Sequence, residues 1–415
     1  MQPRFHPGDV LRAADLNAIV DQFMGLAATG GGPTISVNCG NGDTIGRALE
    51  RALPGTTIQA TGTCNETVRI SKDDITLDGQ GSTRINGGGG EQAAVVVDGA
   101  RRVTLQRLTA GNGFDGVLVQ RGATVIMSSV QAEDNAARGI NIQDNAAAQL
   151  TDCSALRNGD DGIAVTRHSG AIFRGTIISN DSGGRAGTTS NDGIVIGTNS
   201  LAFFDTGAVV TANHNGRVGT VGGRGLSIAG TSHASFSAGS RVTTSDNDLD
   251  GIRVADSSSL PATDTAPFTT SGNGDRGVEV VHASSFFLLR STLMATDNGS
   301  DGIGVLQSSV LRLNDAPAPL TTRGNGSRGV TVTDTSTLVL SNSRLDTTNN
   351  TGDGIGVFGS SRLSFSTGST VFGEMNTHGV NLGDASSINA ASGTTLTLLN
   401  NRRDGLILQR AAGAF

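Results

Sequence analysis

Three aspartates lie where the sequence could bring carboxylates together for chemistry. Asp160 and Asp161 stand directly before Gly162, and Asp192 stands directly before Gly193, 31 residues after Asp161. Both glycines open the same kind of short apolar segment, so a stacked repeat would place the aspartates one above the other. Clustered carboxylates share a proton, as catalytic pairs do, or bind a hard cation such as Ca²⁺. Asp160, Asp161 and Asp192 are therefore both the candidate catalytic residues and the candidate Ca²⁺ ligands, and ordinary solvated turns are the third interpretation.

Two polar insertions accompany these aspartates. They occupy residues 180–187 and 213–219, and each precedes a repeated glycine. Because they follow comparable segments, we expect both loops to project from the same edge of the fold. Their polar side chains are the candidate substrate-binding groups: Asp181, Arg185, His214 and Arg217.

A repeat of about 25 residues must position all of these groups. Asp, Arg or His followed by Gly, an aliphatic residue, any residue and a second aliphatic residue occurs twelve times, from Gly116 to Gly405. Aliphatic residues at alternate positions indicate a strand with one buried face. A second short strand follows each such segment, and a third, weaker one precedes the next repeat. Three short strands per turn predict an all-β, right-handed parallel β-helix of about 15 coils, on the order of 70 Å long.

Two further rows of residues recur in register. Asn stands four residues before the glycine in nine of the twelve repeats, and stacked side-chain amides can bond to one another. The nine residues are Asn112, Asn135, Asn158, Asn247, Asn273, Asn298, Asn325, Asn350 and Asn401. The residue directly before the glycine alternates in charge at nearly every step, from Asp115 through Arg138 and onward, and the alternation breaks between Asp161 and Asp192. As exposed pairs these charges would contribute only about 0–1 kcal/mol each, so we interpret the row as holding the coils in register.

The residue between the paired aliphatics should face outward and would line any groove along that strand face. Only two members of this row are charged, Arg253 and its neighbour Glu279. A surface ion pair is the simpler interpretation of these two. This row therefore gives little support to a catalytic groove.

The start of the repeat region should carry a cap. Ile45, Leu49 and Leu53 fall on one face of a short predicted helix that Pro54 and Gly55 end. Such a helix would cover the open end of the first coil. Cys39 and Cys64 follow comparable strands, so a disulfide between them is one expectation, whereas Cys153 is expected to fill the interior as a small apolar residue.

Composition excludes several classes of protein. The chain has 415 residues, 60 Gly, no Trp, no Tyr and a net charge of -7. The acidic balance gives no electrostatic basis for binding nucleic acid, and no apolar run is long enough to span a membrane. The missing Trp and Tyr side chains remove the usual platforms on which sugars stack. No His or Cys spacing fits zinc, and we expect no cofactor, with Ca²⁺ at the three aspartates as the alternative.

Residues 57–81 and the repeats after them resemble right-handed β-helix proteins of the pectin-lyase-like superfamily. The resemblance covers about residues 34–415 and implies the fold, but that superfamily includes lyases, hydrolases, epimerases and inert scaffolds. Residues 159–164 also resemble the Gly-Asp-Asp segment of polygalacturonase-type hydrolases, which implies acid–base roles for Asp160 and Asp161. The His-Gly pair at His378 lies eight coils away, and the Arg-Ile-Lys motif of those hydrolases is missing, since the only lysine is Lys72.

Residues 1–33 form a separate segment that ends in a Gly-rich linker, and the β-helix is expected over residues 34–415. The Pro-Gly-Asp and Ala-Ala-Asp-Leu-Asn stretches within residues 7–17 resemble the N-terminal segment of some phage tail-fibre and tail-spike proteins. That resemblance implies attachment or assembly, and a second capping helix is the alternative. The segment does not read as a signal peptide. We expect an extracellular or virion-associated protein, with a homo-oligomer as one candidate assembly because the last coil has no evident cap.

Two functions remain open on the sequence. The leading hypothesis is a non-catalytic extracellular or virion-associated scaffold that presents loops to a polysaccharide, a cell-surface glycan or a protein. The alternative is a polysaccharide-active hydrolase or lyase that works around Asp160, Asp161 and Asp192. The missing aromatics and the nearly uncharged outward row favour the scaffold.

Overall fold

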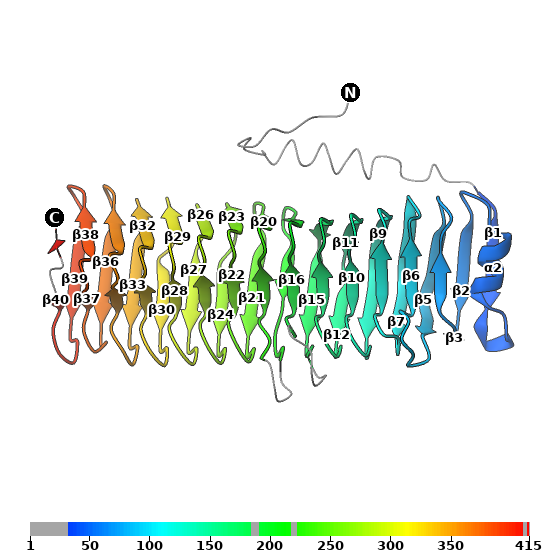
Figure 1. The fold of residues 1–415 in the computed structure, drawn as a ribbon, viewed down its shortest axis with the longest axis horizontal. Coiled ribbons are helices and arrows are strands. Elements are labelled where there is room, and N and C mark those ends of the chain that lie inside the picture. The colour runs from blue at the N-terminus through cyan, green and yellow to red at the C-terminus, as the bar shows by residue number, and fades with distance from the viewer. Residues whose placement is uncertain (1–31, 184–190, 217–221, 410–412, 415) are drawn as a thin grey trace, which may run out of the picture.

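The chain winds into a long parallel β-solenoid of about 15 coils (Figure 1). The computed structural model describes residues 32–183, 191–216, 222–409 and 413–414. The predicted segment 1–33 therefore lies almost wholly outside the described residues, as do Arg185 and Arg217. Among the described residues no helix is long and apolar enough to cross a membrane.

Each coil contributes three short strands, which stack into two parallel sheets. The twelve repeated Gly-aliphatic segments and two earlier strands form a 14-stranded sheet of their own, here called sheet B. Its strands are β4 (Val68–Ile70), β6 (Val95–Asp98), β8 (Val117–Gln120), β10 (Ile140–Ile142), β13 (Ile163–Val165), β16 (Ile194–Ile196), β19 (Leu226–Ile228), β22 (Ile252–Val254), β25 (Val278–Val280), β28 (Ile303–Val305), β31 (Val330–Val332), β34 (Ile355–Val357), β37 (Val380–Leu382) and β40 (Leu406–Leu408).

The two other strands of each coil belong to a 27-stranded sheet, here called sheet A. Its first row is β1 (Thr34–Asn38), β2 (Thr57–Thr61), β5 (Thr76–Asn86), β7 (Val103–Gly111), β9 (Thr124–Glu133), β11 (Ala147–Thr151), β14 (Gly170–Arg174), β17 (Leu201–Phe204), β20 (His233–Phe236), β23 (Ser259–Thr263), β26 (Ser285–Leu289), β29 (Val310–Asn314), β32 (Thr337–Ser341), β35 (Arg362–Phe365), β38 (Ser387–Ala390) and β41 (Gly413–Ala414). Its second row is β3 (Thr63–Asn65), the later halves of β5, β7 and β9, then β12 (Ser154–Leu156), β15 (Thr176–Asn180), β18 (Val209–Thr211), β21 (Arg241–Ser245), β24 (Phe268–Ser271), β27 (Leu293–Thr296), β30 (Leu320–Arg323), β33 (Arg344–Thr348), β36 (Thr370–Glu374) and β39 (Thr395–Leu399). The predicted three strands per coil are confirmed.

Inward-facing aliphatic side chains from the three strand rows form one continuous core along the rod. A run of phenylalanines strengthens its middle: the Phe204 ring stacks on Phe173 and Phe236, with centroids 4.6 and 4.0 Å apart. Cys153 is buried in the same core, as predicted. In the last coil the equivalent positions are partly open, and Leu406 and Leu408 are exposed.

Stacked asparagines bond to one another inside one corner of the rod. The Nδ2 group of one asparagine donates to the Oδ1 atom of the next from Asn215 through Asn376, at 2.9 Å between Asn273 and Asn298. Asn135 bonds Asn158 in the same way, and Ser182 interrupts the ladder between Asn158 and Asn215. The prediction is wrong for Asn112, which is exposed, because Gly113 occupies the ladder position and donates its N–H to Asn135. Asn215 and Asn376 belong to the ladder although the spacing rule passed over them.

A ladder of serines, which the sequence analysis missed, follows sheet B in each coil. The backbone N–H of each serine donates to the Oγ atom of the next at 3.0–3.2 Å. Its members are Ser169, Ser200, Ser232, Ser258, Ser284, Ser309, Ser336, Ser361 and Ser386. Together the two ladders satisfy buried polar groups at two corners of most coils in this run.

The predicted capping helix is α2 (Ile45–Arg51), which follows the short 3-10 helix η1 (Cys39–Asn41) and covers the first coil (Figure 1). Ile45 and Leu49 are buried, but the expectation for Leu53 is wrong. The helix ends before Leu53, and that side chain is 65% exposed. The Cys39–Cys64 disulfide is present and ties the turn before α2 to the next coil.

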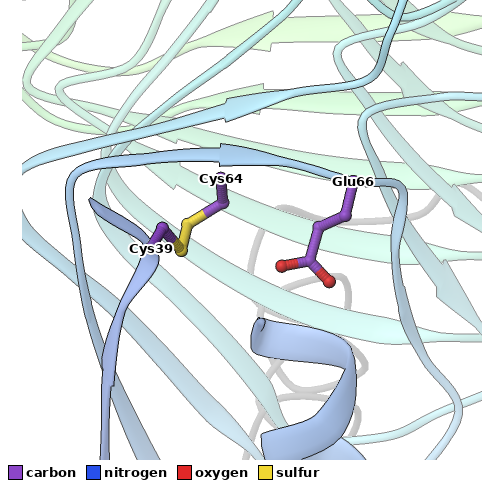
Figure 2. Close-up of side chains that lie close together, drawn as sticks. All are labelled: Cys39, Cys64 and Glu66. Atoms are coloured by element: carbon purple, nitrogen blue, oxygen red, sulfur yellow. A yellow bond between two sulfur atoms is a disulfide. The ribbon is translucent and has the colours of Figure 1, made fainter. Parts of the chain in front are cut away.

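Side chains from the coil below α2 hold both ends of this helix. Glu66 accepts the N–H groups of Ile45 and Gly46 at 2.7 and 2.9 Å, and its carboxylate lies beside the disulfide (Figure 2). Lys72, the only lysine, donates to the carbonyls of Leu49, Glu50 and Ala52 at 2.8–3.0 Å. An anion at the N-terminus and a cation at the C-terminus both complement the helix dipole.

Replacing Lys72 by methionine should loosen the cap. The change keeps the apolar stem but leaves three C-terminal carbonyls without their cation, so we expect a loss of about 1–3 kcal/mol in the free energy of unfolding. Urea unfolding followed by circular dichroism measures it. Arg51→Met is the matched control, because Arg51 lies in the last turn of α2 and its side chain bonds only the carbonyl of Arg47. Equal losses in both variants would contradict the role assigned to Lys72.

Candidate functional site

The charged row before sheet B is a ladder whose acidic members are buried, except for Asp404 at its end, whose side chain is 62% exposed. Asp115, Asp161, Asp192, Asp250 and Asp301 are each no more than 5% exposed. The sequence led us to treat these charges as exposed pairs, and that expectation is wrong for the buried aspartates. Buried charges must be paired and hydrogen-bonded, so each contact in this row matters far more than a surface pair.

One geometry repeats along this ladder. An arginine donates its backbone N–H to the aspartate of the coil before and its Nε–H to the aspartate of the coil after, as Arg138 does with Asp115 and Asp161 at 3.0 and 3.1 Å. Arg224 bonds Asp192 and Asp250 in the same way, at 2.8 and 3.1 Å. Arg276, Arg328 and His378 continue the ladder to Asp404.

The structure places Asp160 and Asp161 around a single arginine. Arg138 lies 3.1 Å from Asp161 through Nε and 3.5 Å from Asp160 through Nη2. The other carboxylate oxygens accept backbone N–H groups, from Asn191 to Asp160 at 3.4 Å and from Asp192 to Asp161 at 3.1 Å. The adjacent coils do bring the three predicted aspartates to one corner, as expected. There they act at least as structural partners.

The pKa of Asp192 lies well above the usual range of an aspartate. Burial raises its pKa to about 7; the Arg224 guanidinium opposes this shift and the charge of Asp161 adds to it. A carboxyl group with this pKa can give or take a proton near neutral pH. Asp192 is, however, only 2% exposed, so its reach toward a bound substrate is small.

The candidate Ca²⁺ ligands do not form a compact trio. Within the described ranges, the only three potential ligand groups whose atoms all lie within 4.8 Å of one another are Cys39, Cys64 and Glu66. The two cysteines are joined in the disulfide, and the Glu66 oxygens bond the start of α2 (Figure 2). Those three groups therefore already have structural partners.

Of the four predicted substrate-binding residues, Asp181 and His214 can be described, and Arg185 and Arg217 lie outside the described residues. Asp181 and His214 occupy the same corner position in adjacent coils, both with positive φ, near 56° and 55°. His214 lies 3.6 Å from Asp246 in the next coil. Asp181 is exposed, so it remains accessible to a partner.

Side chains of the protein cover the outward face of sheet B, on which a catalytic groove would lie. Glu279 is 9% exposed because Arg253 and Arg276 each bond its carboxylate at 2.7 Å. Arg276 also lies across Gly304, so closely that an added Cβ there would come within 2.8 Å of its Cδ. The predicted Arg253–Glu279 pair is confirmed, but it belongs to this covered layer.

The same covering recurs further along the face. Asn141 and Asn381 donate to the buried carboxylates of Asp115 and Asp353 at 2.9 and 3.0 Å. Arg328 lies over the Phe358 ring, 4.9 Å from its centroid. Sequence analysis missed these contacts because a short outward residue gives no sign of the long arginine that the adjacent coil lays over it.

Comparison with known proteins bears on the fold. A family model described as "right handed beta helix region" matches residues 75–239. No curated protein matches the chain. The crystal structure of pectate lyase Pel9A is similar with a TM-score of 0.50 and 11% identity, over 67% of this chain and 80% of the lyase chain.

Two epimerase structures are also similar, at lower TM-scores. The Azotobacter vinelandii mannuronan C-5 epimerase AlgE6 A-module has a TM-score of 0.38 and 16% identity, over 91% of this chain and 99% of its own. The periplasmic alginate epimerase AlgG has a TM-score of 0.43 and 11% identity, over 92% and 83%. The stacked three-strand coils, the family model over residues 75–239 and the likeness to pectate lyase together show that the chain has the fold of a right-handed parallel β-helix.

Proposed function

We propose that the protein is a non-catalytic β-helix scaffold, extracellular or virion-associated, that presents its corner loops to a polysaccharide or a protein. The observation that carries the proposal is the covered outward face of sheet B. Arginines from the ladder lie across this face, as Arg276 does over Gly304, and occupy the space that a groove would need. A polymer would have to displace buried ion pairs to reach the backbone there.

The state of the candidate catalytic groups agrees with a structural role. Asp161 accepts from Arg138 and from the N–H of Asp192, and Asp160 accepts from the N–H of Asn191. Each of these bonds also holds one coil against the next. The chain has no Trp or Tyr to stack on a sugar ring.

A polysaccharide-active enzyme is the second candidate. It is favoured by the pKa of Asp192, which burial raises to about 7, and by the likeness to a pectate lyase structure. In that case Asp192 would exchange a proton with the substrate, and Asp160 and Asp161 would hold it in place. Access to Asp192 would require the corner to open.

Product assays on purified protein distinguish the two functions. Incubation with polygalacturonate or alginate, with Ca²⁺ or with chelator, should yield neither unsaturated products nor new reducing ends, and proton NMR should detect no epimerised residues. Heat-denatured protein sets the baseline. If the protein is active and a folded Asp161→Asn variant has lost that activity, the scaffold hypothesis is wrong and the enzyme hypothesis is supported.

A further inference from the structure

An open groove of about 690 Å³ runs along one corner of the early coils. Asn112, Asp134, Arg157 and Asp181 line it from the same corner position of four successive coils, all with positive φ between 51° and 56°. Gly89 lines it from the coil before. With coils about 4.8 Å apart, the groove follows the rod axis for about 19 Å. Its volume lies within the range of ordinary ligand sites.

The floor of this groove is rigid. Asn135 and Asn158 lie beneath it as buried members of the asparagine ladder, joined by a bond of 2.9 Å. The Gly113 N–H donates to Asn135 at 3.0 Å. A site whose floor is already bonded loses little conformational freedom when a ligand binds.

The walls of the groove offer mainly hydrogen-bond acceptors. Arg157 donates to both oxygens of Asp134, at 2.8 and 3.0 Å, and to Glu133 at 2.8 Å. These bonds lower the pKa of Asp134 and raise that of Arg157, so both are charged, and both are about half exposed. The Asp181 carboxylate and the Asn112 amide add further exposed polar groups. Hydrogen bonds to carboxylates are stronger than neutral ones, and sugar hydroxyls are suitable donors.

The net charge of the groove favours neutral polysaccharides over acidic ones. Among the described lining residues, Asp134 and Asp181 carry negative charges and Arg157 carries a positive one. Glu133 beside them is paired with Arg84. The local balance is therefore negative by one charge. A polymer of uronic acids would be repelled, whereas a neutral chain of hydroxyl groups would not.

We infer that this corner binds a segment of a neutral, hydroxyl-rich polysaccharide laid along the rod. The inference rests on the proposed function only in taking a polysaccharide as the partner. It places the binding surface at the corner that precedes sheet B, away from the covered outward face. Of the two carboxylates that line the groove among the described residues, Asp134 is bonded by Arg157, so we expect the exposed Asp181 carboxylate to bind such a ligand.

Affinity electrophoresis of the full chain tests the groove. Gels containing dextran or galactomannan should retard the protein, and gels containing polygalacturonate or alginate should retard it less. Asp181→Asn, which suits the left-handed backbone, should weaken the apparent affinity about three- to tenfold. Ala136→Gln, which extends a side chain into the groove, should weaken it at least as much.

Asp297→Asn is the matched control. Asp297 is exposed at the same corner position, with φ near 55°, but lies well beyond the groove. The polymer should retard the Asp297→Asn variant as much as the unmodified protein, each measured relative to its own migration in a gel without polymer. Circular dichroism should show all variants folded. Three results would contradict binding at this groove. The Asp181→Asn variant could be retarded as much as the unmodified protein, the uronate polymers could retard the protein more than the neutral ones, or neither neutral polymer could retard it. Cleavage of a polymer would overturn the proposed function while leaving the groove intact.

Discussion

The Arg276→Asp variant is expected to be the most destabilised single-site variant of the charged ladder. Arg276 bonds Asp250 through its N–H, lies 3.6 Å from Asp301 and bonds Glu279 at 2.7 Å. An aspartate there would join three acidic groups that are each at most 9% exposed. Removing one partner of a buried ion pair costs about 3–5 kcal/mol, and the added negative charge increases that loss.

Urea unfolding followed by circular dichroism measures the effect. Arg241→Asp makes the same change of charge at an exposed position of β21 and should change the free energy of unfolding by no more than about 0.5 kcal/mol. Limited proteolysis should also cut the Arg276→Asp variant near β25, because neighbouring coils stabilise one another locally. If both variants unfold alike, the alternation of charge does not stabilise the stack.

The opposite result is expected for Asp192→Asn, which should stabilise the protein at neutral pH. Burial raises the pKa of Asp192 to about 7 in the folded chain, whereas an unfolded aspartate titrates near about 3.9. Between these two pH values the folded chain holds a proton that the unfolded chain has lost. The contribution of Asp192 to the free energy of unfolding is therefore fully present below about pH 4 and is lost as the pH rises to about 7.

Asparagine cannot ionise in either state, so the variant should lose this dependence. We expect a gain of about 4 kcal/mol at pH 7.5, because about three pKa units at about 1.4 kcal/mol each are no longer lost. At pH 4 the difference should be near zero, since the amide oxygen can still accept the Arg224 N–H. Urea unfolding midpoints from pH 4 to pH 8 measure it. Asp297→Asn serves as the exposed control. A difference between the Asp192→Asn variant and the unmodified protein that does not vary with pH would contradict the assigned protonation.

The sequence predicted the strands because their signal is periodic. Each repeated glycine is followed by two aliphatics at alternate positions, and Ile252 and Val254 are buried as that pattern requires. The capping helix followed from the spacing of Ile45 and Leu49, but its end did not, and Leu53 is exposed. Asn376 was missed in the asparagine ladder because it stands three residues before its glycine, Gly379, and the other members were sought four residues before theirs.

The candidate site was harder to predict because it depends on contacts between coils. The repeat spacing predicted that Asp161 lies beside Asp192. In the structure the Asp192 backbone N–H donates to the Asp161 carboxylate at 3.1 Å. The sequence did not reveal that both are buried, since burial there depends on how an arginine such as Arg138 lies against the next coil. Left-handed backbone at Arg157 is equally hard to foresee, because such conformations are uncommon outside glycine, asparagine and aspartate.

The alternating ladder restricts how a rod of this kind can change length. Deleting one coil from the second half would bring two ladder residues of like charge together, as Asp161 and Asp192 already are. Deleting two coils, such as the 52 residues that separate Gly302 from Gly354, would restore every pairing. Viable lengths should therefore differ by pairs of coils, in steps of about 10 Å.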